Sequence, residues 1–473
     1  MARIVIVSNR IPATSPKGPQ AGGLAIGLKD CLKDGGLWFG WSGDISAQTS
    51  TDAKISHTGK IDVATIDLSR EDYKKFYVGY SNSTLWPLLH FQPGLVEFDR
   101  AQFETYLSVN HAFARALAPL IQPSDIIWAH DYHLIPLACS LRALGVKNRI
   151  GFFLHVPFVP ASLLSVLPRA DKLMHMLCTY DVVGFQTHQH LRDFEDCVRN
   201  FLNVPIEPDA SIGIDNHPLR AIATPIGIDA RAFARQAKRS AQSRVTKRLE
   251  ESMVGRALII GVDRLDYSKG LPNRFEAFGR LLDRFSEHRL KVSYLQVAAR
   301  SREDVAEYQR LKRDLDRRAG EINGRHAEFD WVPLRYITRA VSRATLAGFY
   351  RKARVGLVTP LWDGMNLVAK EYVAAQDPDD PGVLVLSRFA GAAEELTEAI
   401  IVNPLDSDEI AEALHQALTM PRAERKARHE KLFEKICRTT AASFCRDFIS
   451  ALLGESCGAD HITTTLVPTA TRS

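Results

Sequence analysis

The chain has 473 residues, of which 24% are charged and 45% hydrophobic, as expected for a folded protein of two or three domains. Sixty basic and fifty-five acidic residues leave a net charge of only +5, spread along the chain, which argues against a nucleic-acid-binding surface. Residues 1–10 do not resemble a signal peptide and no apolar run approaches the ~18 residues of a membrane span, so we expect a cytoplasmic protein.

Short apolar runs alternate with helical segments along the whole chain. The first series predicts strands near residues 4–8, 125–129, 150–155 and 182–186, with a helix over 24–32 and further helices between the strands. After the Pro-Gly segment at 224–229, a second series predicts strands near residues 258–262, 293–298, 355–358 and 382–386, with covering helices over 302–323 and 408–419. This alternation predicts two parallel sheets, each wrapped by helices on both faces.

The seven cysteines are scattered and form no Cys-x-x-Cys motif, so we expect reduced thiols and neither a disulfide framework nor a zinc site. The segment His130-Asp-Tyr-His133 lacks the spacing of a helical zinc motif, and no metal is predicted. The Thr-rich segment 454–473 has few apolar residues and is predicted to be mobile.

The segment 359–371 places a polar turn between an apolar strand and a helix. Its turn, 363–366, presents free backbone N–H groups and the positive end of a helix dipole to an anion. Asp363 can accept hydrogen bonds from sugar hydroxyls, and Glu371 lies one turn into the helix, where it can reach a ribose diol. The alternative is an ordinary strand-to-helix turn capped by Asp363.

A second polar turn, after the strand at 258–262, holds Arg264 and Lys269. In an open parallel sheet, ligands bind beyond the carboxyl ends of the strands, so both turns are expected to face one crevice. The two cations could neutralise a diphosphate leaving group without a metal, Arg264 as a planar fork and Lys269 as a point charge. The alternative is a solvated charged loop.

The N-terminal half offers polar residues at corresponding strand ends. Arg10 closes the first strand and is a plausible phosphate clamp, while Asp131 and Arg302 follow later strands. Gly22 and Gly23 open the next helix and let its backbone approach a diphosphate or sugar. Their spacing is not the dinucleotide fingerprint, and the chain has no Walker A sequence, which disfavours nicotinamide-cofactor and nucleotide-kinase functions.

Together these segments resemble the trehalose-6-phosphate synthases, which are retaining glycosyltransferases. The matching motifs run in family order and are VSNRI at 7–11, AGGL at 21–24, GLWFGWSG at 36–43, SN at 81–82, LWP at 85–87, HDYH at 130–133, GFFLHVPF at 151–158, RLDYSKG at 264–270 and DGMNLVAKE at 363–371. The resemblance extends to about residue 445.

The resemblance implies an α/β fold of two Rossmann-like doubly wound domains facing a cleft, the GT-B architecture. An acceptor-binding domain would span 1–226, joined by a C-terminal crossing helix at about 440–453, and a nucleotide-sugar-binding domain would span 227–439. It implies transfer of glucose from UDP-glucose to glucose 6-phosphate with retention, giving α,α-trehalose 6-phosphate and UDP. The favoured path is front-face attack, in which the leaving phosphate takes the acceptor proton and no protein nucleophile is required.

The resemblance also assigns site residues. The catalytic set would be Arg264, Lys269, Asp363 and His155, with His155 beside the donor glucose. The acceptor would contact Arg10, Trp41, Tyr77, Trp86, Asp131 and Arg302. The donor would contact Gly22, Gly23, Arg264, Lys269, Val341, Asp363, Gly364, Met365, Asn366, Leu367, Val368 and Glu371, with only the backbone of Val341 meeting the nucleobase. No cofactor is expected.

Two positions depart from the family pattern. Trp362 stands where an arginine commonly precedes the Asp-Gly pair, and Ala299-Arg300 replaces the usual Pro-Thr. A transferase using an aminocyclitol phosphate acceptor, and a non-catalytic sugar-phosphate sensor, remain as alternatives. We further expect small-molecule substrates, a homo-oligomer (dimer or tetramer) and a separate trehalose-phosphate phosphatase acting on the product.

Overall fold

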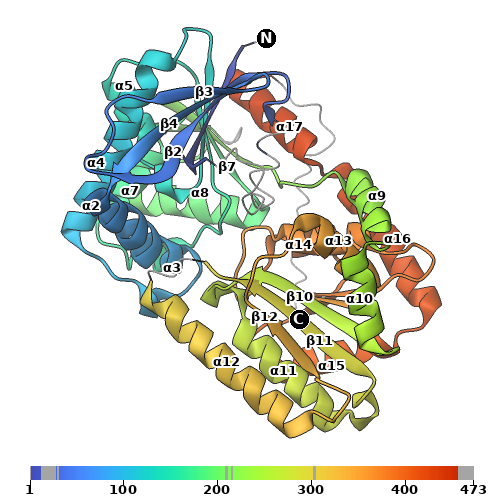
Figure 1. Ribbon diagram of the computed structural model, residues 1–473. Helices are drawn as coiled ribbons and strands as arrows, with labels where there is room; N and C mark the ends of the chain where they lie inside the picture. Colours follow the sequence, from blue (N-terminus) through green and yellow to red (C-terminus); the bar gives the residue numbers. More distant parts are fainter. Residues whose placement is uncertain are drawn as a thin grey trace, which may run out of the picture.

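The computed structural model describes residues 2–11, 28, 31–207, 211–214, 217–301 and 305–455. Two sheets form two α/β domains that lie one above the other in Figure 1. No helix among the described residues is both long enough and apolar enough to cross a bilayer.

The first domain contains a nine-stranded sheet with the order β3-β4-β2-β1-β5-β6-β7-β9-β8. Its strands are β1 (Ile4–Arg10), β2 (Gly36–Ser46), β3 (Lys54–Thr58), β4 (Ile61–Ser69), β5 (Ile126–His130), β6 (Ile150–Phe153), β7 (Val182–Phe185), β8 (Ser211–Ile214) and β9 (His217–Ala223). The four strands predicted for this domain are confirmed. The predicted parallel sheet is confirmed, and one antiparallel strand extends it at each edge: β3 pairs with β4, and β8 pairs with β9.

The second domain contains a parallel six-stranded sheet with the order β12-β11-β10-β13-β14-β15. Its strands are β10 (Ala257–Arg264), β11 (Val292–Ala299), β12 (Leu334–Ile337), β13 (Val355–Val358), β14 (Val383–Ser387) and β15 (Ile400–Val402). Successive residues of β10 enter two different cores: Ile259 packs on one face of the sheet and Leu258 and Ile260 pack on the other. Burial on both faces explains the continuous apolar runs.

The helices cover the faces of the two sheets. In the first domain they are α2 (Arg70–Asp72), the π-helix η1 (Tyr73–Leu85), α3 (Trp86–Leu89), α4 (Arg100–Leu117), α5 (Leu137–Ala143), α6 (Ala161–Leu164), α7 (Ala170–Leu177) and α8 (His188–Leu202). After the first domain follow α9 (Ala230–Ser240), α10 (Arg244–Met253), α11 (Leu271–Arg284), α12 (Ala306–His326), α13 (Arg343–Lys352), α14 (Leu367–Ala375), α15 (Ser407–Thr419), α16 (Arg422–Arg438) and α17 (Ala441–Leu453). Short 3₁₀ turns are η2 (Pro93–Leu95), η3 (Ala118–Leu120), η4 (Tyr132–Leu134), η5 (Tyr267–Lys269), η6 (Ser286–His288) and η7 (Gly391–Glu394).

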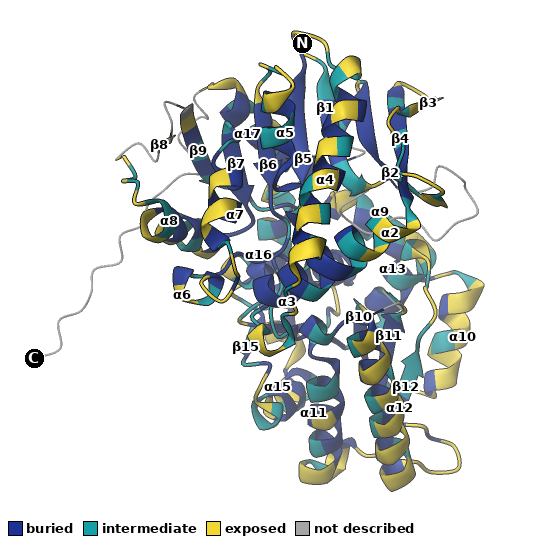
Figure 2. Cartoon of the chain, turned by 90° about the vertical axis from the view of Figure 1, so that its left-hand side faces the viewer, coloured by how far each residue is buried: buried dark blue, intermediate teal, exposed yellow. Residues whose placement is uncertain are grey.

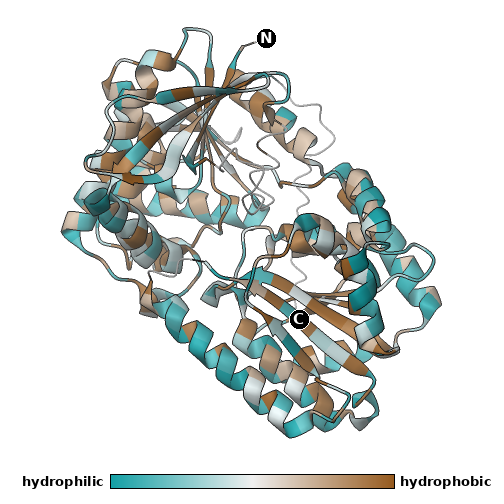
Figure 3. Ribbon diagram, viewed as in Figure 1, coloured by the Kyte–Doolittle hydropathy of each residue, from teal (hydrophilic) through white to brown (hydrophobic). Residues whose placement is uncertain are grey.

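The burial pattern follows these layers. Figure 2 shows buried strands inside both domains and exposed residues along the outer sides of α4 and α12. In Figure 3 the strands β10 and β11 are largely hydrophobic, whereas α12 is mostly hydrophilic. The helices predicted over 302–323 and 408–419 correspond to α12 and α15, which pack a single apolar side on the sheet.

The chain passes between the domains at two places that lie side by side. A Cβ added to Gly227 in the first passage would collide with the carbonyl oxygen of Thr439 in the second. After Thr439, α17 packs on the first sheet, where the ring of Phe448 stacks on Trp128 with a centroid distance of 4.5 Å and an interplanar angle of 8°. A capping box between Thr440 and Ser443 starts α17. Lys370 of α14 donates to the carbonyl oxygen of Ile226 at 2.9 Å.

The expectation of reduced cysteines is wrong for one pair. Cys31 and Cys445 form a disulfide, with Cα atoms 5.8 Å apart and a sequence separation of 414. The pairing arises because α17 returns to the first domain and places Cys445 beside Cys31. The spacing of the cysteines in the sequence therefore did not predict this disulfide, because only the tertiary fold brings the two residues together.

Candidate active site at the junction of the two domains

The turn between β13 and α14 carries the principal carboxylate of the second domain. Asp363 pairs with Lys269 from the turn after β10, with Nζ and Oδ2 2.5 Å apart, and also accepts from the Asn366 amide at 3.0 Å. Burial opposes ionisation, yet Lys269 and Asn366 hold the pKa of Asp363 below its usual value. The two turns that the sequence predicted to face one crevice therefore meet directly.

The start of α14 is built by Asn366 rather than by Asp363. Asn366 has a positive φ of 76°, and its side chain accepts from the backbone N–H of Ala369 at 3.3 Å. The alternative reading of Asp363 as the helix cap is therefore wrong. Since the first N–H groups of a helix have no acceptor within it, the amides of Leu367 and Val368 can point toward an anion beside Asp363.

Glu371 lies one turn further into α14. Its Oε1 accepts from Nε of Arg343 at 2.8 Å, and the residue is buried. Burial raises the pKa of Glu371, and Arg343 opposes the rise. The sequence did not indicate this arginine partner.

The turn between β13 and α14 touches the first domain at Gly364. A Cβ at Gly364 would collide with the carbonyl oxygen of His155, so only glycine allows this approach. His155 is held between two polar groups: its Nε2 lies 3.0 Å from Nδ1 of His130, and its Nδ1 lies 3.2 Å from Nε2 of Gln186. Burial lowers the pKa of His155 to about 3, so the ring is neutral at physiological pH.

Two arginines extend over aromatic rings of the first domain. Arg264 follows β10 and crosses to Trp86 of α3, with its guanidinium carbon 5.6 Å from the ring centroid. Arg10 ends β1 and lies over Trp41 at 5.4 Å. Both arginines are exposed, whereas Trp41 and Trp86 are each only 3% exposed. The guanidinium groups therefore face the junction, and the indoles support them from below.

The remaining predicted acceptor residues lie on the same side of the first sheet. Tyr77 stacks on the His133 ring at 5.8 Å and on Tyr73 at 5.5 Å. Asp131 follows β5 with φ of 75°, an uncommon conformation for a residue with a side chain. Its backbone N–H donates to the carbonyl oxygen of Phe153 at 2.8 Å, which fixes this turn beside the end of β6.

Three predicted residues, Gly22, Gly23 and Arg302, lie outside the described residues. Two other predicted residues pack in a core instead of making the contacts above. Val341 is half-buried against the core shared by α9, α13 and α14, and Met365 is buried in the same core. Arg300 is exposed, and its backbone N–H donates to the Thr338 carbonyl oxygen at 3.2 Å.

Sequence reasoning missed a buried ion pair beneath the cationic turn. Arg274 of α11 is fully buried and pairs with Asp263, the residue before Arg264. The same guanidinium donates to the carbonyl oxygen of Lys269 at 2.9 Å and to Oγ1 of Thr359 at 3.0 Å. Arg274 therefore ties both site turns together from below. The only signal in the sequence was one charged residue among apolar residues between the predicted strands at 258–262 and 293–298.

Two buried histidines near Asp363 were also missed. The Nδ1–H of His90 donates to the carbonyl oxygen of Trp86 at 2.8 Å, and His190 lies in the first turn of α8. Burial lowers the pKa of each to about 4. Both side chains are therefore neutral groups in the wall of the site.

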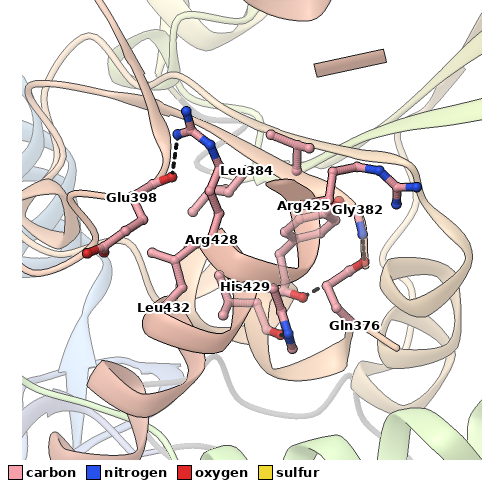
Figure 4. Close-up of a pocket in the computed structure, with 11 residues that line it drawn as sticks. Gln376, Gly382, Leu384, Glu398, Arg425, Arg428, His429 and Leu432 are labelled. Atoms are coloured by element: carbon pink, nitrogen blue, oxygen red, sulfur yellow. Dashed lines mark hydrogen bonds between the residues drawn. The ribbon is translucent and has the colours of Figure 1, made fainter. Parts of the chain in front are cut away.

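Two other clusters already satisfy their own polar groups. Figure 4 shows a pocket between α14 and α16, where Arg428 donates to the carbonyl oxygen of Glu398 at 3.0 Å and Gln376 accepts from the N–H of Gly382 at 2.8 Å. Near α15, the imidazoles of His288 and His415 bond each other at 2.9 Å beside Glu287. Neither cluster lies at the domain junction.

Comparison with known proteins agrees with this geometry. Residues 3–453 match the model of glycosyltransferase family 20. A trehalose-6-phosphate synthase of Sinorhizobium fredii is 46% identical over 97% of this chain and all of its own. Two parallel-sheet domains that meet at charged strand ends define a GT-B glycosyltransferase. The chain belongs to glycosyltransferase family 20.

Two solved structures share the whole fold. One is an α,α-trehalose-phosphate synthase (UDP-forming) from Burkholderia xenovorans in complex with glucose 6-phosphate, 49% identical, with a TM-score of 0.93 over 96% of this chain and all of that one. The other, from Escherichia coli, is bound with UDP-2-fluoro glucose, 45% identical, with a TM-score of 0.90 over 95% of this chain and 99% of that one. The expected two-domain α/β architecture is confirmed.

Proposed function

We propose that this protein transfers glucose from UDP-glucose to glucose 6-phosphate with retention, forming α,α-trehalose 6-phosphate and UDP. The observation that carries the proposal is the convergence of Arg264, Lys269 and Asp363 at the junction of the two domains. This set supplies two cations for a departing diphosphate and one carboxylate for sugar hydroxyls. The ligands of the Burkholderia and Escherichia relatives support the same pair of substrates.

The donor is assigned to the second domain, which we take as residues 227–439. Its diphosphate would meet Arg264, Lys269 and the amides of Leu367 and Val368. Lys269 carries three N–H donors, so one can stay on Asp363 while the others reach a phosphate oxygen. The further donor contacts would be Gly22, Gly23, Val341, Gly364, Met365, Asn366 and Glu371.

Glu371 would accept from the ribose hydroxyls. Arg343 holds the carboxylate in place from the other side, and an ionised Glu371 can accept from two hydroxyls while keeping this partner. Burial favours the neutral form, so the arginine is needed to keep the group a strong acceptor.

The acceptor is assigned to the first domain, residues 1–226 with the crossing helix at about 440–453. Arg10 would bind the phosphate of glucose 6-phosphate together with Arg302. Trp41, Tyr77, Trp86 and Asp131 would surround its sugar. Trp86 also lies under the Arg264 guanidinium, so the proposed acceptor and leaving-group sites share this residue.

The chemical step follows from the placement of charge. As the bond between the glucosyl carbon and the phosphate oxygen breaks, negative charge develops on UDP, and Arg264, Lys269 and the α14 amides stabilise it more than they stabilise the ground state. The acceptor hydroxyl attacks from the same face and gives its proton to that phosphate oxygen. His155 and Asp363 hold the donor sugar in orientation. Because two cations are already in place, the step needs no metal.

The proposed reaction has consequences for the fate of the product, the cellular compartment and the oligomeric state. The phosphate remains on the product, so release of free trehalose falls to a separate phosphatase. We place the reaction in the cytoplasm. Association into a dimer or tetramer is part of the proposal and can be measured by sedimentation.

The decisive experiment measures nucleoside diphosphate release from UDP-, GDP- and ADP-glucose, with and without glucose 6-phosphate, and determines the anomeric linkage of the product. Acceptor-dependent release of UDP with an α,α-linked disaccharide phosphate is expected. If nucleoside diphosphate were released only with an aminocyclitol phosphate, that compound would be the acceptor. If the substrates bound without any release, the protein would be a sugar-phosphate sensor.

A further inference from the structure

Trp362, the residue directly before Asp363, is the centre of a stack of three aromatic rings. Its ring lies 3.8 Å from Phe91, with an interplanar angle of 21°, and 4.3 Å from Phe389, with an angle of 10°. All three residues are half-buried. Two nearly parallel faces therefore enclose one indole.

The stack joins the two domains. Phe91 belongs to the first domain and follows α3, whereas Trp362 and Phe389 belong to the second. Figure 1 shows α3 at the side of the first domain that faces the second. Phe91 has φ of 57°, and its N–H donates to the carbonyl oxygen of Leu88 at 3.0 Å. A bulky residue held in the left-handed region indicates that its ring position is imposed by the surroundings.

The stack is also connected to the reacting centre by the backbone. The N–H of Asp363 donates to the carbonyl oxygen of Phe389 at 3.1 Å, and the N–H of Gly391 donates to the carbonyl oxygen of Asp363 at 3.0 Å. The N–H of Leu361 donates to the carbonyl oxygen of Ser268, the neighbour of Lys269, at 2.7 Å. Trp362 thus lies between two backbone contacts that fix the ion pair of Lys269 and Asp363.

The same short segment of the first domain makes both aromatic contacts with the second. Trp86, at the start of α3, supports Arg264, and Phe91, just after α3, covers Trp362. We propose that Trp362 is a positioning residue that, through its stack with Phe91, holds the two domains in the closed arrangement in which donor and acceptor groups meet. The kinetic part of this inference rests on the proposed transferase function.

The kinetic test compares Trp362→Leu, Phe91→Leu and the double variant. An aromatic pair contributes the equivalent of a roughly two- to tenfold change in an equilibrium constant. If the closed form becomes rarer, the KM values for nucleotide sugar and sugar phosphate rise together by that factor, while kcat stays within about twofold because saturating substrates drive closure. The double variant should show no further loss, because either single change already removes the contact.

A conservative variant and a matched control accompany the test. Trp362→Phe keeps a stacking ring and should restore most of the wild-type KM. Phe329→Leu removes a fully exposed aromatic of the same domain and should change nothing. The proposal would be overturned if the KM increases of the two single variants multiplied in the double variant. It would also be overturned if only the KM for the nucleotide sugar rose, because a local defect in the turn between β13 and α14 gives that pattern.

A second measurement does not depend on turnover. Small-angle X-ray scattering of the ligand-free protein should give a larger radius of gyration for Trp362→Leu and Phe91→Leu than for wild type, and an unchanged radius for Trp362→Phe and Phe329→Leu. Equal radii throughout would contradict the domain-holding role even if the kinetics changed. If wild type forms no product, the proposed function fails, and scattering alone decides on the stack.

Discussion

Lys269 and Asp363 are 94 residues apart in sequence, yet their side chains form an ion pair of 2.5 Å between the two site turns. The pair is largely buried, with side-chain exposures of 11% and 15%. In the proposed reaction one partner meets phosphate and the other meets the sugar. The contact therefore serves both stability and catalysis, and the two roles can be separated.

Lys269→Met should lower kcat by about 10²–10³, the range typical for loss of one group that stabilises developing charge. It should also lower the free energy of unfolding by about 3 kcal/mol, because Asp363 is left buried without its cation. The double variant Lys269→Met, Asp363→Asn should recover most of the stability but none of the turnover. Urea unfolding and UDP release measure the two effects. A double variant no more stable than the single would contradict the pairing.

Arg264→Ala should reduce kcat by about 10²–10³, since in the proposed reaction the guanidinium would face the departing diphosphate. Tyr77→Phe should reduce it by no more than about fivefold, the equivalent of one neutral hydrogen bond. Steady-state rates under saturating substrates test the contrast. Small and equal losses in both variants would remove Arg264 from the leaving-group site.

Acid should destabilise the protein through its buried histidines. The folded-state pKa values of His90 and His190 are about 4, against about 6.5 in the unfolded chain. Between these values the unfolded state binds more protons, so the free energy of unfolding falls as pH falls from 6.5 to 4, by up to about 1.4 kcal/mol per pH unit for each imidazole. Below pH 4 these two groups add no further loss.

Chemical denaturation at several pH values measures this slope. His190→Asn should flatten it between pH 6.5 and 4, whereas His111→Asn, a change at an exposed position on α4, should leave it as in wild type. An unchanged slope in His190→Asn would show that folding does not lower the pKa of this imidazole.

Cutting the link between Cys31 and Cys445 should lower the free energy of unfolding by about 2–5 kcal/mol, because the bond closes a very long loop in the unfolded chain. Either a reductant or Cys31→Ser should produce this loss, and the two together should not add. Cys437→Ser changes a free thiol and serves as the control. Peptide mapping without reductant would show the crosslinked pair directly, and two free thiols would refute it.

The strands that carry the site were predictable from sequence. Each is a continuous apolar run buried on both faces, with a charged residue at its carboxyl end or in the turn beyond, as at Arg264 in β10 and Asp363 after β13. Such runs identify parallel strands, and parallel strands bring their carboxyl ends to one edge. Local pattern and global arrangement agree at these two turns.

The strands β2, β3 and β8 were not predictable in the same way. In β2 the glycines Gly36, Gly40 and Gly43 interrupt the apolar run, and Gly36 and Gly43 have positive φ. A pattern of apolar residues broken by glycine also fits a loop. The antiparallel pairing of β3 and β8 depends on partners across the sheet, which periodicity does not specify.

The supporting contacts were hidden because their partners are far apart in sequence. In the sequence, Arg274 is one charged residue among apolar neighbours. It ties the two site turns together only through its contacts with Asp263 and Thr359, which lie beneath separate turns. Trp362 was visible as a departure from the family pattern, but only the fold shows Phe91 against its ring.

The contact between Gly227 and Thr439 has a mechanical consequence. Because the two linkers touch, a rotation that bends both at this point keeps their contact. A rotation that twists one domain relative to the other would force the linkers past each other. A side chain at Gly227 would act as a wedge between the linkers. The close approach of the two linkers therefore depends on a hydrogen atom standing where any other residue would place a carbon.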